Sequence, residues 1–207
     1  PSADPQEVAV AMVRGAYEYQ GQKCSAASRI YVPKSLWPTV RDRAVAMMRE
    51  ITIGDTRDFR NFMSAVIDKK AFTKIGGYIS HAKRNAKIIQ GGGSNGRVGY
   101  FVEPTLVQTD NPGYKLLCEE IFGPVLTAHA YADSKFNEML QVVDQTSPPA
   151  PVTTTAPTER SSARRRRHCE TPPATSTSTT SRPAPPWASS PLAARGRRAP
   201  TTRPARS

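Results

Sequence analysis

Apolar residues recur at three- and four-residue spacing along several stretches of residues 1–146, a pattern typical of amphipathic helices. Ser2 or Asp4 can cap the start of the first stretch, and Gly21 follows its end. Asp133 is the expected cap of the last stretch. The predicted helices cover residues 4–19, 35–50, a stretch that starts after Asp68, and 133–144.

Short runs rich in β-branched and aromatic residues lie between these helices. Strands that alternate with amphipathic helices favour an α/β fold, with a mostly parallel sheet and flanking helices. No internal repeat interrupts this order. The predicted strands cover residues 29–32, 87–90, 99–108 and 124–131.

The C-terminal part of the chain has a different composition. Residues 147–207 carry 11 basic and 2 acidic side chains, 12 of the 19 prolines and 20 Ser or Thr residues. Their large apolar residues are few, so folding would bury too little apolar surface to offset the loss of conformational entropy. We therefore expect two regions, an α/β domain over residues 1–146 and a disordered tail over residues 147–207.

Several classes of protein are excluded by the sequence. No run of eighteen apolar residues is present, so we expect no membrane span. Cys24, Cys118 and Cys169 are too widely spaced for a disulfide framework or a zinc site, so we expect no metal and a reducing compartment. The chain starts at Pro1 without Met or a leader, and we expect it to be a fragment.

The spacing of Gly91, Gly93 and Gly96 matches that of a dinucleotide-binding fingerprint. That fingerprint requires a following helix, whose N-terminus binds the pyrophosphate. The residues at 97–102 instead favour a strand. We therefore interpret the glycines as a turn.

Cys24 is a candidate nucleophile. It follows Gly21 in a loop, with Lys23 beside it and small residues after it. A reactive cysteine needs partial exposure, nearby positive charge and room for a substrate. The alternative is that Cys24 is a small buried hydrophobic residue, which is the common state of a lone cysteine.

Residues 119–124 combine two acids, an aromatic residue and a Gly-Pro pair. Composition alone favours a helix end that leads into a tight turn. Cys118, just before it, is expected to be buried. His81 and His129 lack a recognisable partner and are expected to be packing or surface residues.

Together, these segments resemble the aldehyde dehydrogenase superfamily. The stretch at 18–29 contains Gly-Gln-Lys-Cys, and the stretch at 119–125 contains Glu-Ile-Phe-Gly-Pro. Residues 31–37 and 99–104 narrow the resemblance to the branch that oxidises L-glutamate γ-semialdehyde to L-glutamate in proline catabolism. The resemblance extends over residues 1–146.

The resemblance implies a role for each motif residue. Cys24 is the implied nucleophile, which forms a thiohemiacetal and then, after hydride transfer to NAD, a thioester that water hydrolyses. Its backbone N–H contributes to the oxyanion hole. Ser25 contacts the substrate carboxylate, Glu120 binds the nicotinamide ribose, and Phe122 packs beside the same half of NAD. The resemblance also implies that the parent enzyme is a homo-oligomer that acts on a small-molecule aldehyde. For a eukaryotic parent, we expect it to lie in the mitochondrial matrix. We expect no membrane partner and no specific nucleic-acid partner.

Residues 147–207 depart from the family pattern, because the family's later strand, helix and substrate-anchoring loop are missing there. Back-translation of residues 168–204 in a shifted frame permits Asn-Phe-Tyr-Ile-Asn and Gly-Gly-Ala-Arg-Ala-Ser-Gly, both typical of the family. We therefore interpret the tail as a frameshift product and expect this chain itself to be inactive. A transcript read in one continuous frame through this region would contradict the frameshift.

A rival function rests on the four arginines at 164–167. Such a run favours nonspecific polyanion binding, because it lacks interleaved aromatic residues and an accompanying nucleic-acid-binding fold. Binding that disappears when residues 147–207 are deleted, and that falls steeply with salt, would support this alternative.

Overall fold

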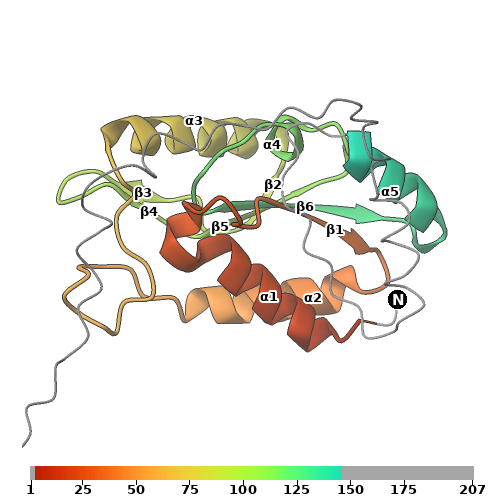
Figure 1. Ribbon diagram of the computed structural model, residues 1–207, viewed down its shortest axis with the longest axis horizontal. Coiled ribbons are helices and arrows are strands. Elements are labelled where there is room, and N and C mark those ends of the chain that lie inside the picture. The colour runs from red at the N-terminus through yellow and green to blue at the C-terminus, as the bar shows by residue number, and fades with distance from the viewer. Residues whose placement is uncertain (1–2, 146–207) are drawn as a thin grey trace, which may run out of the picture. The chain divides into compact units, whose positions relative to one another are not determined.

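The computed structural model describes residues 3–145 (Figure 1). The predictions for Ser2, the tail at 147–207 and the arginines at 164–167 lie outside the described residues. No helix among the described residues is both long enough and apolar enough to cross a membrane.

The helices are α1 (Pro5–Tyr17), α2 (Trp37–Arg49), α3 (Lys69–Asn85), α4 (Lys115–Cys118) and α5 (Phe136–Gln145), with 3-10 turns η1 (Glu18–Gly21) and η2 (Asp133–Lys135). The strands are β1 (Arg29–Pro33), β2 (Lys87–Gln90), β3 (Ser94–Asn95), β4 (Phe101–Val102), β5 (Thr105–Thr109) and β6 (Val125–Tyr131).

Four strands form one sheet in the order β1-β6-β5-β2. β6 pairs in parallel with both β1 and β5, whereas β2 pairs antiparallel with β5 at the edge. Every residue of β6 is buried, as expected for a parallel strand covered on both faces. The prediction of a mostly parallel α/β sheet with flanking helices is confirmed.

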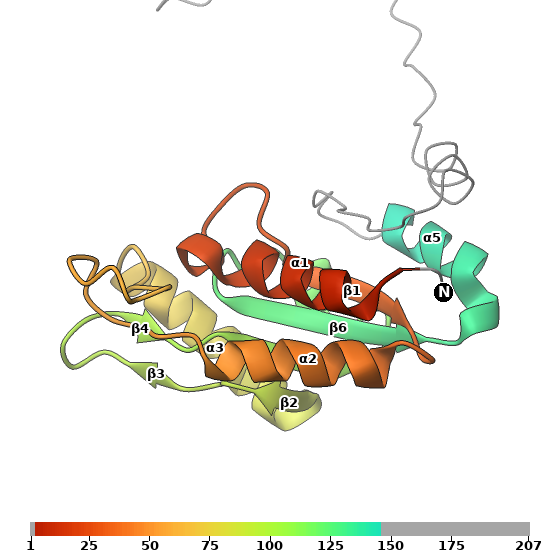
Figure 2. The ribbon, with the colours of Figure 1, turned by 90° about the horizontal axis from the view of Figure 1, so that it is seen from below.

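Helices cover both faces of this sheet. Figures 1 and 2 show α1 and α2 on one face and α3 on the other. On β5, Leu106 joins the apolar cluster under α1 and α2, and its neighbour Val107 joins the cluster under α3. Successive residues of a strand point to opposite faces, so β5 contributes to both cores.

The predicted starts of two helices are confirmed by their caps. The Asp4 carboxylate accepts a hydrogen bond from the backbone N–H of Gln6 at 2.7 Å. The Asp68 carboxylate accepts one from the backbone N–H of Ala71, also at 2.7 Å. Each cap satisfies an N–H group that has no partner within the first helical turn.

The prediction that Asp133 caps the last helix is wrong. Its carboxylate accepts hydrogen bonds from the backbone N–H of Ser35, at 3.3 Å, and from the Ser35 hydroxyl, which lower the pKa of Asp133. α5 therefore begins only at Phe136, after η2. Ser35 itself lies outside α2, which begins at Trp37 rather than at residue 35.

The strand predicted over 99–108 is divided in two. β4 ends at Val102 and β5 begins at Thr105, because Pro104 lies between them and has no backbone N–H for a strand ladder. Gly91 packs against this break with a φ of 77°, and a Cβ on it would lie 2.1 Å from the carbonyl oxygen of Pro104. β3 and β4 form a small antiparallel pair after this glycine. As predicted, a strand and not a helix follows Gly91, Gly93 and Gly96, but the three glycines do not form a single turn, because β3 lies between Gly93 and Gly96.

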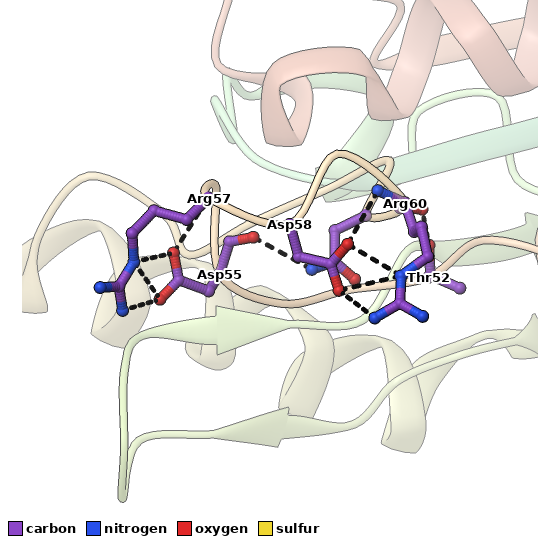
Figure 3. Close-up of polar contacts among 6 residues, drawn as sticks. Thr52, Asp55, Arg57, Asp58 and Arg60 are labelled. Carbon is purple, nitrogen blue, oxygen red and sulfur yellow. Dashed lines mark hydrogen bonds and ion pairs between the residues drawn. The ribbon is translucent and has the colours of Figure 1, made fainter.

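The loop between α2 and α3 is organised by two Asp-x-Arg repeats (Figure 3). Asp55 accepts hydrogen bonds from the backbone N–H of Arg57 at 2.9 Å and from its guanidinium at 2.6–3.1 Å. Asp58 repeats this pattern with Arg60. The pKa values of both aspartates are lowered by these bonds. All four side chains are exposed, so the pairs define the loop path while adding little stability.

Candidate functional site

The loop that carries Cys24 leaves α1 through an unusual backbone turn. Tyr19, Gln20 and Gly21 have φ angles of 53°, 58° and 65°. The left-handed region is unfavourable for Tyr and Gln, and such strain persists only where the surrounding structure fixes it. The loop is tied back to α1, because the backbone N–H of Ala27 donates to the carbonyl of Gly15 at 2.9 Å.

Cys24 lies exposed in this loop as a free thiol, and Ser25 beside it is also exposed. The alternative of a buried hydrophobic cysteine is therefore wrong for Cys24. Cys118, expected to be buried, is half-buried at the end of α4. Of the two thiols in the described part of the chain, Cys24 has the access that a substrate requires.

Lys23 does not contribute a free positive charge beside the thiol. Its ammonium lies 2.7 Å from the Glu18 carboxylate, and this hydrogen bond, with the attraction between the charges, lowers the pKa of Glu18. The same ammonium lies 5.8 Å from the centre of the Tyr19 ring. The charge of Lys23 is thus paired within the turn that precedes Cys24.

The two motifs, about a hundred residues apart in the sequence, meet in space. A Cβ on Gly21 would lie 2.5 Å from the carbonyl oxygen of Gly123, so the two backbones approach as closely as glycine permits. Next to this contact, the Gln22 amide donates to the carbonyl of Phe122 at 3.4 Å. The fold therefore places the Cys24 loop beside the Glu-Ile-Phe-Gly-Pro segment.

The segment at 119–123 follows α4 and turns sharply before β6, which confirms the predicted helix end and tight turn. Phe122 has a φ of 58°, and its side chain is 41% exposed. On the other side of the segment, the Lys74 ammonium on α3 donates to the carbonyl of Glu120 at 2.8 Å. Glu120 is exposed, so its carboxylate is accessible from solvent.

The neighbouring acid, Glu119, is held by α3 instead. The Tyr78 hydroxyl donates to its carboxylate at 2.6 Å, and the Lys115 ammonium lies 3.8 Å away. The hydrogen bond to Glu119, together with burial, raises the pKa of Tyr78 to about 12. Both consecutive acids are exposed, but they differ in what is bound, because the carboxylate of Glu119 is held by Tyr78 and Lys115 whereas Glu120 is held through its backbone carbonyl by Lys74.

We expect Tyr78→Phe to lower the free energy of unfolding at pH about 9, and we expect this difference from the wild type to become smaller as the pH rises. The pKa of Tyr78 is about 12 in the folded chain, against about 10 when unfolded. Its contribution is therefore complete below pH ~10 and declines as the pH rises toward ~12. Urea unfolding at pH about 9 and about 11 should show the advantage of the wild type over Tyr78→Phe shrinking with pH. A constant difference would contradict the assignment.

Both histidines have a polar partner in the fold, although the sequence shows no recognisable partner for either. His81 Nδ1 lies 3.0 Å from the Tyr114 hydroxyl, and the buried His129 has its Nδ1 3.1 Å from the carbonyl oxygen of Thr109. Within residues 3–145, no group of three or more His, Cys, Asp or Glu side chains is placed to bind a metal ion.

Three side chains at the site were not singled out by the sequence. Lys74 and Tyr78 lie one turn apart on α3 and hold the 119–120 segment. The sequence shows that Lys74 and Tyr78 are four residues apart on a predicted helix and therefore share a face, but it does not show which segment they contact. Gln22 belongs to the Gly-Gln-Lys-Cys motif, and its bond to Phe122 becomes evident only in the fold.

Comparison with known proteins gives a consistent result. Residues 1–148 match the model of the aldehyde dehydrogenase family. The mitochondrial delta-1-pyrroline-5-carboxylate dehydrogenase of Dictyostelium discoideum is 54% identical over 138 residues, which are 66% of this chain and 25% of that protein. The mitochondrial enzyme of the same name from Homo sapiens is 46% identical over 149 residues, 70% of this chain and 26% of that protein.

Solved structures of proteins with related names also resemble this chain. The delta-pyrroline-5-carboxylate dehydrogenase of Mycobacterium tuberculosis, bound with NAD and cobalamin, is 39% identical with a TM-score of 0.67, covering 70% of this chain and 27% of that one. A Thermus 1-pyrroline-5-carboxylate dehydrogenase with bound NAD is 31% identical with a TM-score of 0.65, with the same coverage. The chain spans about a quarter of the length of these relatives.

Proposed function

Because this chain belongs to the aldehyde dehydrogenase family, we propose that it contributes the nucleophile and part of the cofactor site to an enzyme that oxidises L-glutamate γ-semialdehyde to L-glutamate with NAD. The observation that carries the proposal is the exposed thiol of Cys24, which lies on a loop whose Gly21 and Gln22 contact Gly123 and Phe122. The relatives named for pyrroline-5-carboxylate, the cyclic form of this aldehyde, support the substrate.

Cys24 acts first in the proposed chemistry. Its thiolate adds to the aldehyde carbonyl, so that a C–S bond forms and the carbonyl oxygen becomes an oxyanion, which the backbone N–H of Cys24 stabilises. Bound NAD would supply the acceptor for the hydride that leaves this carbon. The resulting thioester links the acyl group to Cys24 until water cleaves the C–S bond, which releases the carboxylate and restores the thiol.

Glu120 and Phe122 are the residues proposed to hold NAD. The Glu120 carboxylate is an exposed hydrogen-bond acceptor, which suits the ribose hydroxyl groups. Phe122 offers an exposed aromatic surface, which suits the nicotinamide half of the cofactor. Both residues lie on the segment that contacts the Cys24 loop, so their chemistry and position suit the nicotinamide half of NAD.

Ser25 is proposed to recognise the substrate carboxylate, and the test compares two aldehydes. The protein translated from the complete gene should form NADH from L-glutamate γ-semialdehyde with a kcat/KM at least about a hundredfold above that for an aliphatic aldehyde lacking the α-carboxylate and ammonium groups. Ser25→Ala should narrow this gap by raising KM for the semialdehyde about tenfold. Equal rates for the two aldehydes would contradict the proposed substrate.

We expect Glu120→Gln to weaken NAD binding while leaving the nucleophile intact. The amide is a weaker acceptor than a carboxylate, because hydrogen bonds to ionised groups are roughly twice as strong. KM for NAD should rise about tenfold, with a smaller change in KM for the aldehyde. Glu119→Gln is the matched control, because that carboxylate is bound to Tyr78. An equal rise in both variants would contradict the role of Glu120.

Location and assembly are also part of the proposal. The relatives from Dictyostelium discoideum and Homo sapiens are named as mitochondrial enzymes, which supports the mitochondrial matrix for a eukaryotic parent. We propose a homo-oligomer on the strength of the family alone. The polyanion-binding alternative rests on residues 164–167, outside the described part, and the relatives do not support it.

A further inference from the structure

One half-buried side chain connects three separate segments at the site. The Gln22 amide oxygen accepts a hydrogen bond from the backbone N–H of Ile67 at 3.0 Å, and the amide nitrogen donates to the carbonyl of Phe122 at 3.4 Å. Gln22 itself lies two residues before Cys24. The loop after α2, the Cys24 loop and the Phe122 segment therefore meet at a single amide.

The direction of this amide is set by the backbone. The Ile67 N–H is a donor and requires the oxygen of Gln22, so the nitrogen must face Phe122. The partner carbonyl belongs to a residue whose φ of 58° is unfavourable for a bulky side chain. Such a conformation persists only when outside contacts determine it, and Gln22 supplies one such contact.

The Phe122 segment is held from its other side by α3. Lys74 binds the carbonyl of Glu120, two residues before the carbonyl bound by Gln22. Lys74 lies on α3, whereas Gln22 lies on the loop that carries Cys24. Of these two contacts, the one made by Gln22 relates the position of Phe122 to that of Cys24.

We propose that Gln22 is a positioning residue that couples the Cys24 loop to the Glu120–Phe122 segment. Its amide keeps the thiol and the two exposed side chains in a fixed relative placement. The inference rests on the proposed function in treating these residues as one site. The coupling itself is a property of the folded chain and can be measured without catalysis.

Gln22→Glu removes one of the two hydrogen bonds of Gln22 and keeps the other. The carboxylate keeps the acceptor for Ile67 but cannot donate to Phe122, and it places a negative charge against that carbonyl. Hydrogen exchange of the 207-residue chain at pH about 7.5 should become about three- to tenfold faster at Ala26 in the loop and at Val125 after the segment. Both amides are reporters because each donates within its own turn, to Lys23 and Gly123.

Protonation of the new carboxyl should restore the coupling. A Glu side chain has a pKa of about 4.3, and once protonated it can donate to the Phe122 carbonyl as the amide does. At pH about 4, exchange in Gln22→Glu should therefore approach that of the wild type at the same pH. Relief of the negative charge contributes to this rescue, so a residue that serves only as packing is excluded by an uncharged variant of similar size.

Two further variants complete the test. Gln22→Met fills similar space without either hydrogen bond and should exchange faster at both pH values. Gln141→Glu makes the same change of charge at an exposed position of α5 and should leave both amides unchanged. Exchange that stays at the wild-type rate in Gln22→Glu, or that is equally fast at both pH values, overturns the proposal. Failure of the proposed function would instead appear as absent NADH formation by the protein translated from the complete gene, with the exchange pattern of the 207-residue chain retained.

Discussion

Gly21→Ala is expected to lower the free energy of unfolding by about 3 kcal/mol or more, the largest loss of stability among the substitutions considered. The φ of Gly21 is 65°, where an L side chain is strained. Its Cβ would also lie 2.5 Å from the carbonyl oxygen of Gly123 and 2.7 Å from that of Ala16. Neither obstacle is the end of a flexible side chain, so the backbone itself must move.

The matched control is the same substitution on α3. Gly77 has no atom within 4 Å of the position that a Cβ would occupy and lies within the helix. Gly77→Ala should therefore raise the free energy of unfolding by about 0.5–1 kcal/mol, because alanine favours helix more than glycine does. Urea unfolding of both variants measures the contrast. A loss below about 1 kcal/mol for Gly21→Ala would show that the two motifs do not pack this closely.

The regular elements could be predicted because their signals are local. The strand over 87–90 has the bounds of β2, and the helix predicted after Asp68 is confirmed with its cap. Burial of one face and satisfaction of the first N–H groups act within a few residues. The failed prediction for Asp133 involves a distant partner, because Ser35 binds its carboxylate. The strand predicted over 99–108 failed for a local reason, because Pro104 divides it.

The backbone of the site could not be predicted from residue type. Tyr19, Gln20 and Phe122 have left-handed backbones, a conformation that the sequence usually signals with glycine or asparagine. Contacts across about a hundred residues stabilise these conformations, including the bond from Gln22 to Phe122. The motifs and the implied nucleophile were visible in the sequence, whereas the side chains that align them depend on the fold.

Cys24→Ser is expected to abolish aldehyde oxidation, with a fall in kcat of at least about a thousandfold in the protein translated from the complete gene. A hydroxyl ionises far less readily than a thiol, so the attacking anion is almost absent near neutral pH. The ester that serine would form also has a poorer leaving group than the thioester. Because Cys24 is exposed, the free energy of unfolding should change by less than about 0.5 kcal/mol.

Cys118→Ser is the matched control, since this half-buried thiol lies at the end of α4 with no proposed part in the chemistry. NADH formation should persist within a few fold in this variant and disappear in Cys24→Ser. Iodoacetamide should likewise inactivate the wild type and Cys118→Ser at similar rates, through the exposed thiol that both retain. Activity that survives Cys24→Ser, or that is lost equally in both variants, would remove Cys24 as the nucleophile. The position of its loop beside Phe122 would then serve the fold alone.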